Sequence, residues 1–408
     1  MPSRAMLHTG RTLFHLDREG QEIPQEHITL GECLRSAGYT TFGTGKWHNG
    51  RSAYARSFSS GDEIFFGGMG DHWNVPAYHF DPTGRYQSKC PYVADPFYSN
   101  KTEYRDCDHI DAGKHSTELF VETAIRFVKG HKQRNPFFMY VSLMAPHDPR
   151  TMPKQFLEMY DPERIDLPSN FLSEHPIDTG ALQVRDELLA AFPREPNEIK
   201  RHIAEYYAMI SHLDHAFGQL LNTLQENGKL DNTIIVFAGD NGLALGQHGL
   251  MGKQNLYDHS LRVPLIFAGP GIPEGEQRVS PVYLLDIFPT LCHLTGTRIP
   301  ESVEGKSLVS CINSPDADVR TSLYLAYANS IRGLTNGDHK LIEYACGQTQ
   351  LFDLSKDPLE TEKIADKPTS SSLLAQMRQN LLSLSREWDD ERHPKGQEFW
   401  KQRDDLKL

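Results

Sequence analysis

The sequence predicts an α/β protein with a mostly parallel central sheet flanked by helices, followed by a smaller antiparallel sheet with a packing helix. The apolar run Ile234–Phe237 is typical of a strand buried on both faces of a parallel sheet, and strands are also expected at 136–143 and 262–269. Segments with helical periodicity separate these runs. From about residue 320 the pattern changes to short alternating runs between Gly and Asn turns. We therefore expect a large domain over 1–318 and a smaller one over 319–408.

Length and composition narrow the class of protein. The 408 residues suffice for one large α/β domain and a smaller one, and 38% hydrophobic with 24% charged content fits a soluble globular enzyme. A net charge of -12 argues against nucleic acid or an anionic membrane as partner. No apolar run approaches the ~20 residues of a membrane helix, and no signal peptide is recognisable, so localisation stays open. Six scattered Cys lack CxxC spacing, which disfavours zinc; a Cys90–Cys107 disulfide is one option.

The remaining elements are expected in a regular order along the chain. A first helix begins at Ser3, which can cap it. Segments 50–110 and 150–195 lack periodicity and are expected as excursions, the first lining a substrate cleft, and the polar tail from Arg392 is expected to be mobile. The other expected helices are 27–38, 115–129, 198–225, 284–291 and 371–387, and the other strands are 39–43, 323–328, 339–344 and 350–354. Core positions expected on the 198–225 helix are Ile203, Tyr207, Ile210, Leu213 and Phe217.

The strand at 234–237 ends in residues suited to a metal. Asp240 and Asn241 offer a carboxylate and an amide oxygen, the ligands that Ca²⁺ or Mg²⁺ prefers. His248 and Lys253 follow within one loop and can return to the same place. A plain Asp-Asn-Gly turn with a solvated Lys is the simpler interpretation of this stretch alone.

Two other strand ends carry similar chemistry, which favours a functional site. Lys46 and His48 follow the strand at 39–43, and His147 follows the strand at 136–143. Ligands of open α/β sheets bind at the carboxyl ends of strands, so these groups are expected together. At the start of the chain, Arg4 lies in the first helical turn, where free N–H groups favour anions. A helix that starts this abruptly suggests a strand encoded upstream of it.

Together these stretches resemble the formylglycine-dependent sulfatases of the alkaline phosphatase-like superfamily. Each match is weak alone, but the set spans nearly the whole chain in the family's order. The matching stretches are Pro2-Ser3-Arg4 with Thr9-Gly10-Arg11, Gly45-Lys46-Trp47-His48, Ala145-Pro146-His147-Asp148-Pro149, Asp240-Asn241-Gly242 with His248-Gly249 and Gly252-Lys253, and Leu351-Phe352-Asp353-Leu354 with Asp357-Pro358 and Glu360-Thr361.

The resemblance implies a sulfuric ester hydrolase that cleaves a sulfate ester such as that of a sulfated sugar. A hydrated formylglycine would attack the sulfur and form a covalent sulfo-enzyme. Ca²⁺, with Mg²⁺ as the alternative, would be held partly by Asp240 and Asn241 and would polarise the sulfate oxygens. Implied catalytic residues are Arg4, Lys46, His48, His147 and Lys253; of these Lys46, His147 and Lys253 would bind sulfate, and Ser3 and His248 would support the site from behind.

The resemblance also implies parts that this sequence does not contain. The family's motif is Cys-x-Pro-Ser-Arg, and Met1 occupies the x position, so the Cys would lie immediately before it. The family's first strand, with two Asp ligands, would lie farther upstream. We expect no turnover from the chain beginning at Met1. A mis-chosen start, a fragment and a pseudoenzyme remain open, and the intact motif after Met1 favours the first. A full-length form would need a formylglycine-generating enzyme as partner.

Two other functions stay open at this point. One is a phosphatase or phosphodiesterase of the same superfamily, with Ser or Thr at the position before Met1. The other is a non-catalytic sulfatase-like binding protein, although the presence of all four of Lys46, His48, His147 and Lys253 weighs against a decayed site. The Tyr- and His-rich segment 50–110 favours a polar substrate such as a sulfated sugar.

Overall fold

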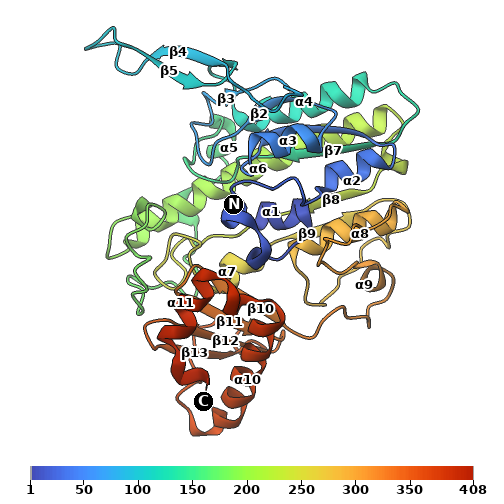
Figure 1. The fold of residues 1–408 in the computed structure, drawn as a ribbon. Helices are drawn as coiled ribbons and strands as arrows, with labels where there is room; N and C mark the ends of the chain where they lie inside the picture. The colour runs from blue at the N-terminus through green and yellow to red at the C-terminus, as the bar shows by residue number, and fades with distance from the viewer. Residues whose placement is uncertain (1, 408) are drawn as a thin grey trace.

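The computed structural model describes residues 2–407, which form an α/β body and a C-terminal four-stranded sheet (Figure 1). The main sheet of the body has three parallel strands in the order β2–β1–β7. Its central strand is β1 (Thr40–Lys46), between β2 (Ser60–Phe65) and β7 (Phe137–Ser142). The expected parallel sheet is confirmed, and because its strands run the same way they end at one edge.

Two long helices pack against this sheet and against each other. They are α4 (Ser116–Gly130), capped by the ring of His115, and α6 (Pro196–Glu226). Both match the expected helices to within one or two residues. One apolar cluster joins the two helices with side chains of β7; its buried members are Val121, Ala124, Val128, Ala216, Leu220 and Leu224.

The expected core face of α6 is partly wrong. Ile203 is buried, but Tyr207 and Ile210 are 45% and 40% exposed. The helix instead buries small and polar residues such as Ala208 and His212. The reason is that one face of α6 packs on α4 and another face packs on short α5 (Lys154–Leu157). Apolar spacing alone does not show which stripe of so long a helix is covered.

The first two helices form where they are expected, and the second is shorter than the expected 27–38. The first helix, α1 (Pro2–Thr9), already includes Pro2, so Ser3 lies within the helix and is not the cap that was expected; the helix buries Ala5 and His8. In α2 (Leu30–Ser36) the Thr29 side chain accepts from the Glu32 N–H, and the Glu32 carboxylate accepts from the Thr29 N–H. This reciprocal capping fixes the start of α2.

The apolar run at 234–237 does not form a strand of the parallel sheet. It forms β8 (Ile235–Ala238), which pairs antiparallel with β9 (Leu265–Ala268) in a separate two-stranded sheet. Its residues are half-buried, so the expectation of a parallel strand buried on both faces is wrong. The loop after β8, with short α7 (Asp258–Leu261), returns the chain in the opposite direction.

Segment 50–110 contains more regular structure than expected. It holds α3 (Arg51–Ser57), strand β2 and a small pair formed by β3 (Pro76–Ala77) and β6 (His109–Ile110). A hairpin of β4 (Lys89–Val93) and β5 (Thr102–Asp106) projects away from the body (Figure 1). The strand β2 escaped sequence analysis because its first residues, Ser-Gly-Asp-Glu, are polar.

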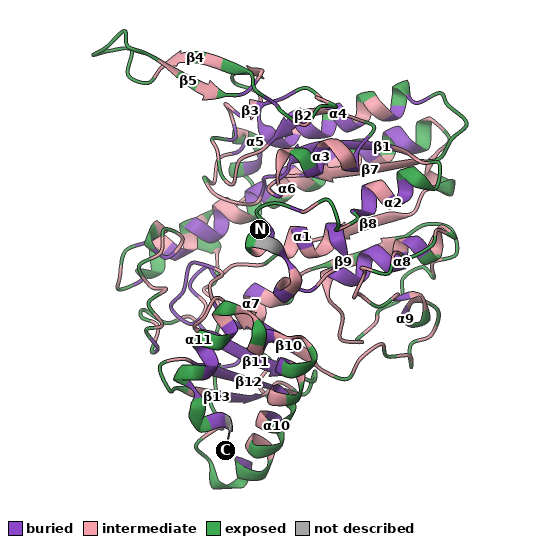
Figure 2. Cartoon of the chain, in the orientation of Figure 1, coloured by how far each residue is buried: buried purple, intermediate pink, exposed green. Residues whose placement is uncertain are grey.

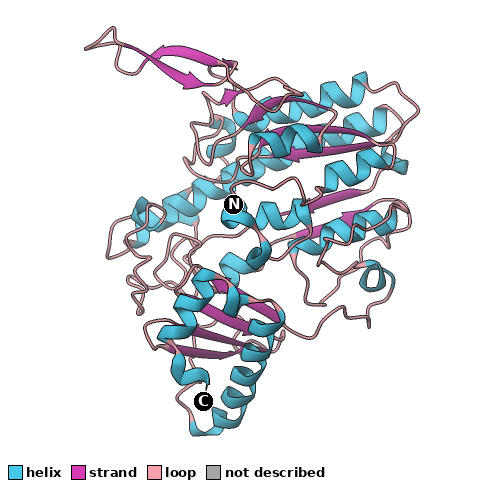
Figure 3. Ribbon diagram, viewed as in Figure 1, coloured by secondary structure: helices cyan, strands magenta, loops and turns pink. Residues whose placement is uncertain are grey.

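The C-terminal sheet is antiparallel, in the order β10–β11–β12–β13, with helices against it (Figure 3). Its strands are β10 (Leu323–Tyr327), β11 (Ile331–Thr335), β12 (His339–Tyr344) and β13 (Thr349–Asp353), of which β11 was not expected. The helix α10 (Ser371–Glu387) has the expected bounds.

The tail after Arg392 is not a mobile end. It forms α11 (Pro394–Gln402), whose Phe399 and Trp400 are 0% and 1% exposed within the C-terminal core. Figure 2 shows the C-terminal strands as buried. Two inward aromatic side chains in an otherwise polar helix give too weak a periodic signal, so the prediction from composition failed.

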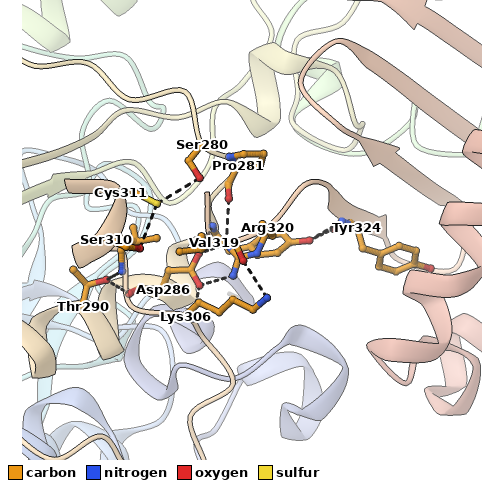
Figure 4. Close-up of polar contacts among 12 residues, drawn as sticks. Ser280, Pro281, Asp286, Thr290, Lys306, Ser310, Cys311, Val319, Arg320 and Tyr324 are labelled. Atoms are coloured by element: carbon orange, nitrogen blue, oxygen red, sulfur yellow. Dashed lines mark hydrogen bonds and ion pairs between the residues drawn. The ribbon is translucent and has the colours of Figure 1, made fainter. Parts of the chain in front are cut away.

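A buried ion pair ties the body to the segment entering the C-terminal sheet. Asp286, at the start of α8 (Ile287–Leu294), is fully buried. It accepts two hydrogen bonds from the Arg320 guanidinium, at 2.5 and 2.8 Å, and one from the Lys306 N–H at 2.8 Å (Figure 4). Helix α9 (Val309–Asn313) lies in the connecting segment. The boundary expected after residue 318 stays a prediction.

Two other expectations concern cysteines and membranes. The six cysteines are free thiols, and Cys90 Sγ donates to the main-chain carbonyls of Cys107 and Asp108 at 3.5 and 3.1 Å. The Cys90–Cys107 bridge is therefore not formed. Within residues 2–407, no helix has both the length and the apolar composition to span a bilayer.

Candidate functional site

Arg4 joins the ends of three strands that are far apart in sequence. Its Nε donates to Asp240 Oδ2 at 2.7 Å, just after β8. One terminal nitrogen donates to the Lys46 carbonyl oxygen at 3.1 Å, at the end of β1, and to Ser142 Oγ at the end of β7. The first turn of α1 thus places a guanidinium where three strands deliver polar groups.

Asp240 is ionised in this setting. Burial acts to raise the pKa of its carboxyl, but the charge and hydrogen bond of Arg4, with the charge of Lys46, lower it overall. The carboxylate therefore stays charged at neutral pH, and Arg4 is its direct partner.

Lys46 is a buried ammonium beside other cations. Its Nζ donates to the Gly68 carbonyl oxygen at 2.5 Å. Burial, together with the charges of Arg4 and Lys253, lowers the pKa of Lys46 to about 8. In the part of the chain that the structure describes, this ammonium forms no ion pair with a carboxylate, so at a strand end it is suited to bind an anionic ligand.

His48 lies two residues farther on, against the same Gly68. A Cβ atom on Gly68 would approach His48 Cε1 to 2.8 Å, so the absence of a side chain there lets the ring lie flush with the loop. Burial and the charge of Lys46 lower the pKa of His48 to about 4. His48 is therefore neutral at neutral pH and able to accept a proton.

His147 follows β7 and is held by the main chain. Its Nδ1 lies 2.9 Å from the Asp148 carbonyl oxygen, to which it donates in the neutral tautomer, and its own carbonyl accepts from His72 Nε2 at 2.9 Å. Burial lowers the pKa of His147. The Asp148 carboxylate is in turn paired with Arg185.

Lys253 reaches the same neighbourhood from the loop after β8. Its Nζ donates to Asp186 Oδ2 at 2.7 Å, and Gln254 donates to the same oxygen at 2.9 Å. Although burial acts in the opposite direction, these two hydrogen bonds lower the pKa of Asp186 to about 2. The positive charge of Lys253 also contributes to the lowered pKa of Lys46 and of His147, in both of which burial is the largest cause.

Three predicted site residues lie at the margin of this group or outside it. Ser3 precedes Arg4 in the first turn of α1. Asn241 is exposed, and its amide donates to the Gly242 carbonyl at 2.9 Å instead of turning toward Asp240. His248 is buried against Tyr257, with ring centroids 4.0 Å apart, and its pKa is lowered to about 4 mainly by burial. It thus packs toward the C-terminal sheet.

The structure adds residues that sequence analysis missed. Ser142 and Tyr140 of β7 contact Arg4. Arg185 and Asp186 come from the irregular segment 150–195 and pair with Asp148 and Lys253. Asp148 was part of a recognised stretch, but nothing in the sequence singled out Arg185 and Asp186, because only the folded chain brings them to Lys253.

The described residues do not form a complete calcium site. Within residues 2–407 no group of three or more His, Cys, Asp or Glu side chains is arranged to hold a metal ion. Asp240 is bound by Arg4, and the Asn241 amide is turned away. Calcium usually takes six to eight oxygens, so these two residues alone do not suffice.

The arrangement is suited to binding a tetrahedral anion next to a neutral base. Arg4, Lys46 and Lys253 supply three cationic groups, and His147 adds a ring whose orientation is fixed. His48 adds the neutral imidazole. Cationic donors in a half-buried site stabilise negative charge more strongly than they would in water.

Two family models match the sequence. The model described as Sulfatase matches residues 1–297, and the model described as N-sulphoglucosamine sulphohydrolase, C-terminal, matches residues 246–387. The first covers Arg4, Lys46, His147 and Lys253, and the second covers the whole C-terminal sheet and α10.

Individual relatives and solved structures agree with these matches. An ulvan-active sulfatase of Formosa agariphila is 28% identical over 410 residues, covering 96% of this chain and 72% of that protein. A structure solved with its substrate D-glucosamine-2-N,6-O-disulfate has a TM-score of 0.76 at 21% identity, covering 96% of this chain and 89% of that chain. The phosphonate monoester hydrolase of Silicibacter pomeroyi has a TM-score of 0.71 at 20% identity, covering 95% and 85%. The structural likenesses show a shared fold, and the match over residues 1–297 shows that the chain belongs to the sulfatase family.

Proposed function

We propose that this chain is a sulfuric ester hydrolase that acts on a sulfated sugar. The observation that carries the proposal is the junction at Arg4, which brings the end of β1, with Lys46 and His48, next to Asp240. The ulvan-active relative and the fold neighbour solved with a disulfated glucosamine support a sulfated sugar as the substrate class.

The cationic side chains have two roles, binding the sulfate oxygens and balancing the charge that develops during cleavage, and Lys46 has both. Lys46, His147 and Lys253 hold the sulfate oxygens, and Arg4 with Lys46 balances the negative charge that grows during cleavage. Because Nδ1 of His147 donates to the Asp148 carbonyl, Nε2 remains for the sulfate or the leaving oxygen. Lys253 carries the proton that the departing alcohol needs.

His48 acts as the base. Its pKa of about 4 leaves the ring neutral at neutral pH, so it is ready to take a proton from a hydroxyl of the hydrated nucleophile. The nearby ammonium of Lys46 contributes to this low pKa. One buried cation thus both binds the anion and keeps the neighbouring base unprotonated.

The nucleophile and the metal are further parts of the proposal. Formylglycine, made by a sulfatase-maturing enzyme from a Cys encoded immediately before Met1, would supply the attack on sulfur. Met1 itself lies outside the described residues. Within residues 2–407, β7 and β8 are each paired along one edge only, which supports a further strand between them. The acidic ligands on that strand are what the family resemblance implies. Asp240 and Asn241 would then be two of several oxygen ligands of Ca²⁺.

Two alternatives are distinguished by the residue before Met1 and by substrate. A phosphatase or phosphodiesterase of the superfamily would have Ser or Thr at the position before Met1. A phosphonate monoester hydrolase shares the fold, so this function is tested as an alternative. A non-catalytic binding protein would bind sulfate and release no alcohol.

The experiment uses the protein extended upstream through the proposed Cys, with the aldehyde verified by mass spectrometry. Turnover is compared on the 4-nitrophenyl sulfate, phosphate and phosphodiester at equal concentrations. The matched control is the same extended protein with that Cys replaced by Ala. We expect the sulfate ester to be hydrolysed fastest and the control to be inactive.

Each other outcome points to a specific alternative. Faster hydrolysis of a phosphate ester identifies the phosphatase class. No turnover despite a verified aldehyde, together with measurable sulfate binding, identifies a binding protein. Turnover by the chain beginning at Met1 contradicts the proposed nucleophile.

A further inference from the structure

The hairpin of β4 and β5 receives little support from the rest of the molecule. It forms a sheet of only two strands and extends away from the body (Figure 1). Phe97 and Tyr98 at its tip are 91% and 90% exposed, and Tyr104 on β5 is 66% exposed. Isolated two-stranded hairpins are marginally stable in water, and clustered exposed apolar side chains mark interaction surfaces. The hairpin therefore has the properties of a segment that packs against a partner.

The two edges of the hairpin differ in their capacity to pair. The edge strand β4 contains Pro91, which has no N–H to donate, and Lys89, whose charge opposes strand addition. The sequence of β5 is Thr-Glu-Tyr-Arg-Asp, with neither proline nor lysine. In the described chain, β5 makes main-chain hydrogen bonds to no element other than β4. The free edge of β5 is thus the one open to another strand.

The charges on β5 are complementary to themselves under a two-fold axis. Glu103 accepts from Tyr92 Oη at 3.0 Å, and the Arg105 guanidinium lies over the Tyr92 ring at 4.8 Å, so both lie on one face. Antiparallel pairing of β5 with the same strand of a second copy, centred on Tyr104, places Glu103 of each copy opposite Arg105 of the other. Opposite charges directly across a strand pair stabilise it.

We propose that this chain forms a two-fold homodimer through β5–β5 pairing, which makes a four-stranded intermolecular sheet. The two-fold axis passes by Tyr104, and each Tyr104 packs against its counterpart. With a rise of ~3.3 Å per residue, the hairpin tip lies roughly 17 Å from the axis, past the base of the other hairpin at roughly 7 Å, where it faces the body of the second copy. Phe97 and Tyr98 are covered there by the second copy. This dimer does not depend on the proposed function.

The test is a charge swap on the full chain, read by sedimentation equilibrium. The wild type is expected at twice its 46.3 kDa mass. Glu103→Arg puts Arg opposite Arg, and Arg105→Glu puts Glu opposite Glu, so each variant alone is expected to be monomeric. Mixing the two variants restores opposite charges at both positions and is expected to give a heterodimer. The double variant with both changes is expected to dimerise by itself.

A matched control changes the same amount of charge elsewhere. Lys132→Glu, on an exposed loop between α4 and β7, shifts the net charge as much as Arg105→Glu and is expected to remain dimeric. A wild type that stays monomeric at all concentrations overturns the proposal. So do single variants that remain dimeric, since these would place the interface elsewhere. A mixture that stays monomeric excludes the Glu103–Arg105 register.

Discussion

Two groups of buried charges in this molecule are built in opposite ways. Between α10 and α11, beside the C-terminal sheet, the Asp390 carboxylate accepts from Tyr324 Oη at 2.6 Å, from Arg332 at 2.7 and 2.9 Å, and from Trp400 Nε1 at 2.9 Å. At the strand ends of the body, the one hydrogen-bond acceptor of Lys46 Nζ among residues 2–407 is a carbonyl oxygen, and the pKa of Lys46 falls to about 8.

The first group stabilises the folded chain, whereas the charge of Lys46 is destabilised by burial and is kept in place by the surrounding fold. Both carboxylate oxygens of Asp390 accept hydrogen bonds, and Arg332 supplies the opposite charge, so burial of the carboxylate is compensated. Lys46 lies near Arg4 and Lys253, and its charged form is disfavoured relative to the unfolded chain. The Lys46 ammonium lies where three strands end. We therefore interpret the stability that is lost by burying it as what leaves a cation available to bind an anion.

The largest expected effect is on stability, from breaking the compensated group. Asp390→Asn removes the charge that Arg332 faces and replaces an acceptor by a donor. Breaking a buried pair on one side typically costs about 3–5 kcal/mol of unfolding free energy, measurable by urea denaturation. The control is Asp366→Asn, whose carboxylate is 81% exposed in its ion pair with Lys363 and should cost less than about 1 kcal/mol. Equal losses in both variants would show that Asp390 is not a special site.

The next effect is on turnover, from removing the uncompensated charge. In the extended, aldehyde-bearing protein, Lys46→Met keeps the apolar stem and removes the ammonium. Loss of one donor to a developing charge lowers rates by ~10²–10³-fold. Unfolding free energy should stay the same or rise, because a disfavoured charge is removed. His147→Ala should likewise lower turnover far more than stability. A collapse in stability with normal turnover of the folded fraction would contradict the functional role of either residue.

A smaller effect concerns calcium. Asp240 and Asn241 supply too few oxygens for tight binding, so the chain beginning at Met1 should bind Ca²⁺ weakly or not at all. The extended protein should bind it and gain thermal stability by mass action. Calorimetric titration and melting of both forms, with Asp240→Asn as the control, measure this. Equal saturable stabilisation of the two forms would mean that residues 2–407 hold a complete site.

The smallest effect is a pH dependence of sulfate binding. Lys46 is protonated below its pKa of about 8, so sulfate affinity should be highest there and fall as pH rises through about 8. If that proton is required, the affinity falls about tenfold per pH unit above this point. Lys46→Arg stays charged and should show a flat profile between roughly pH 7 and 9.5. A parallel fall in the Arg variant would assign the dependence to another group.

The sequence predicts the parts of this site that follow from local pattern. The strands that lead to His48 and His147 and the helix that carries Arg4 form near their predicted positions. The first of these strands is predicted to end at residue 43 but continues through Lys46. Arg4 is predicted as a site residue from the anion-favouring first turn of its helix and from the sulfatase resemblance. Nothing in the sequence shows that it contacts the ends of three strands.

The rest depends on tertiary structure. The apolar run of β8 predicts a strand in a parallel sheet, but β8 pairs antiparallel with β9. Asp186 reaches Lys253 from 67 residues away in an irregular segment. The helix α11 and the strand β2 have few apolar positions. They are stabilised because Trp400 and Phe65 pack into apolar clusters that other elements largely supply.

The most direct test of the account asks whether the cations at the strand ends bind sulfate. The melting temperature of the chain is measured against inorganic sulfate at constant ionic strength, for the wild type and Lys46→Met. Sulfate also stabilises proteins through exclusion from their surface, which does not saturate and is the same for both. We predict an additional saturable increase for the wild type that Lys46→Met lacks. The same saturable increase in both proteins, or none in the wild type, would contradict the assignment of this site.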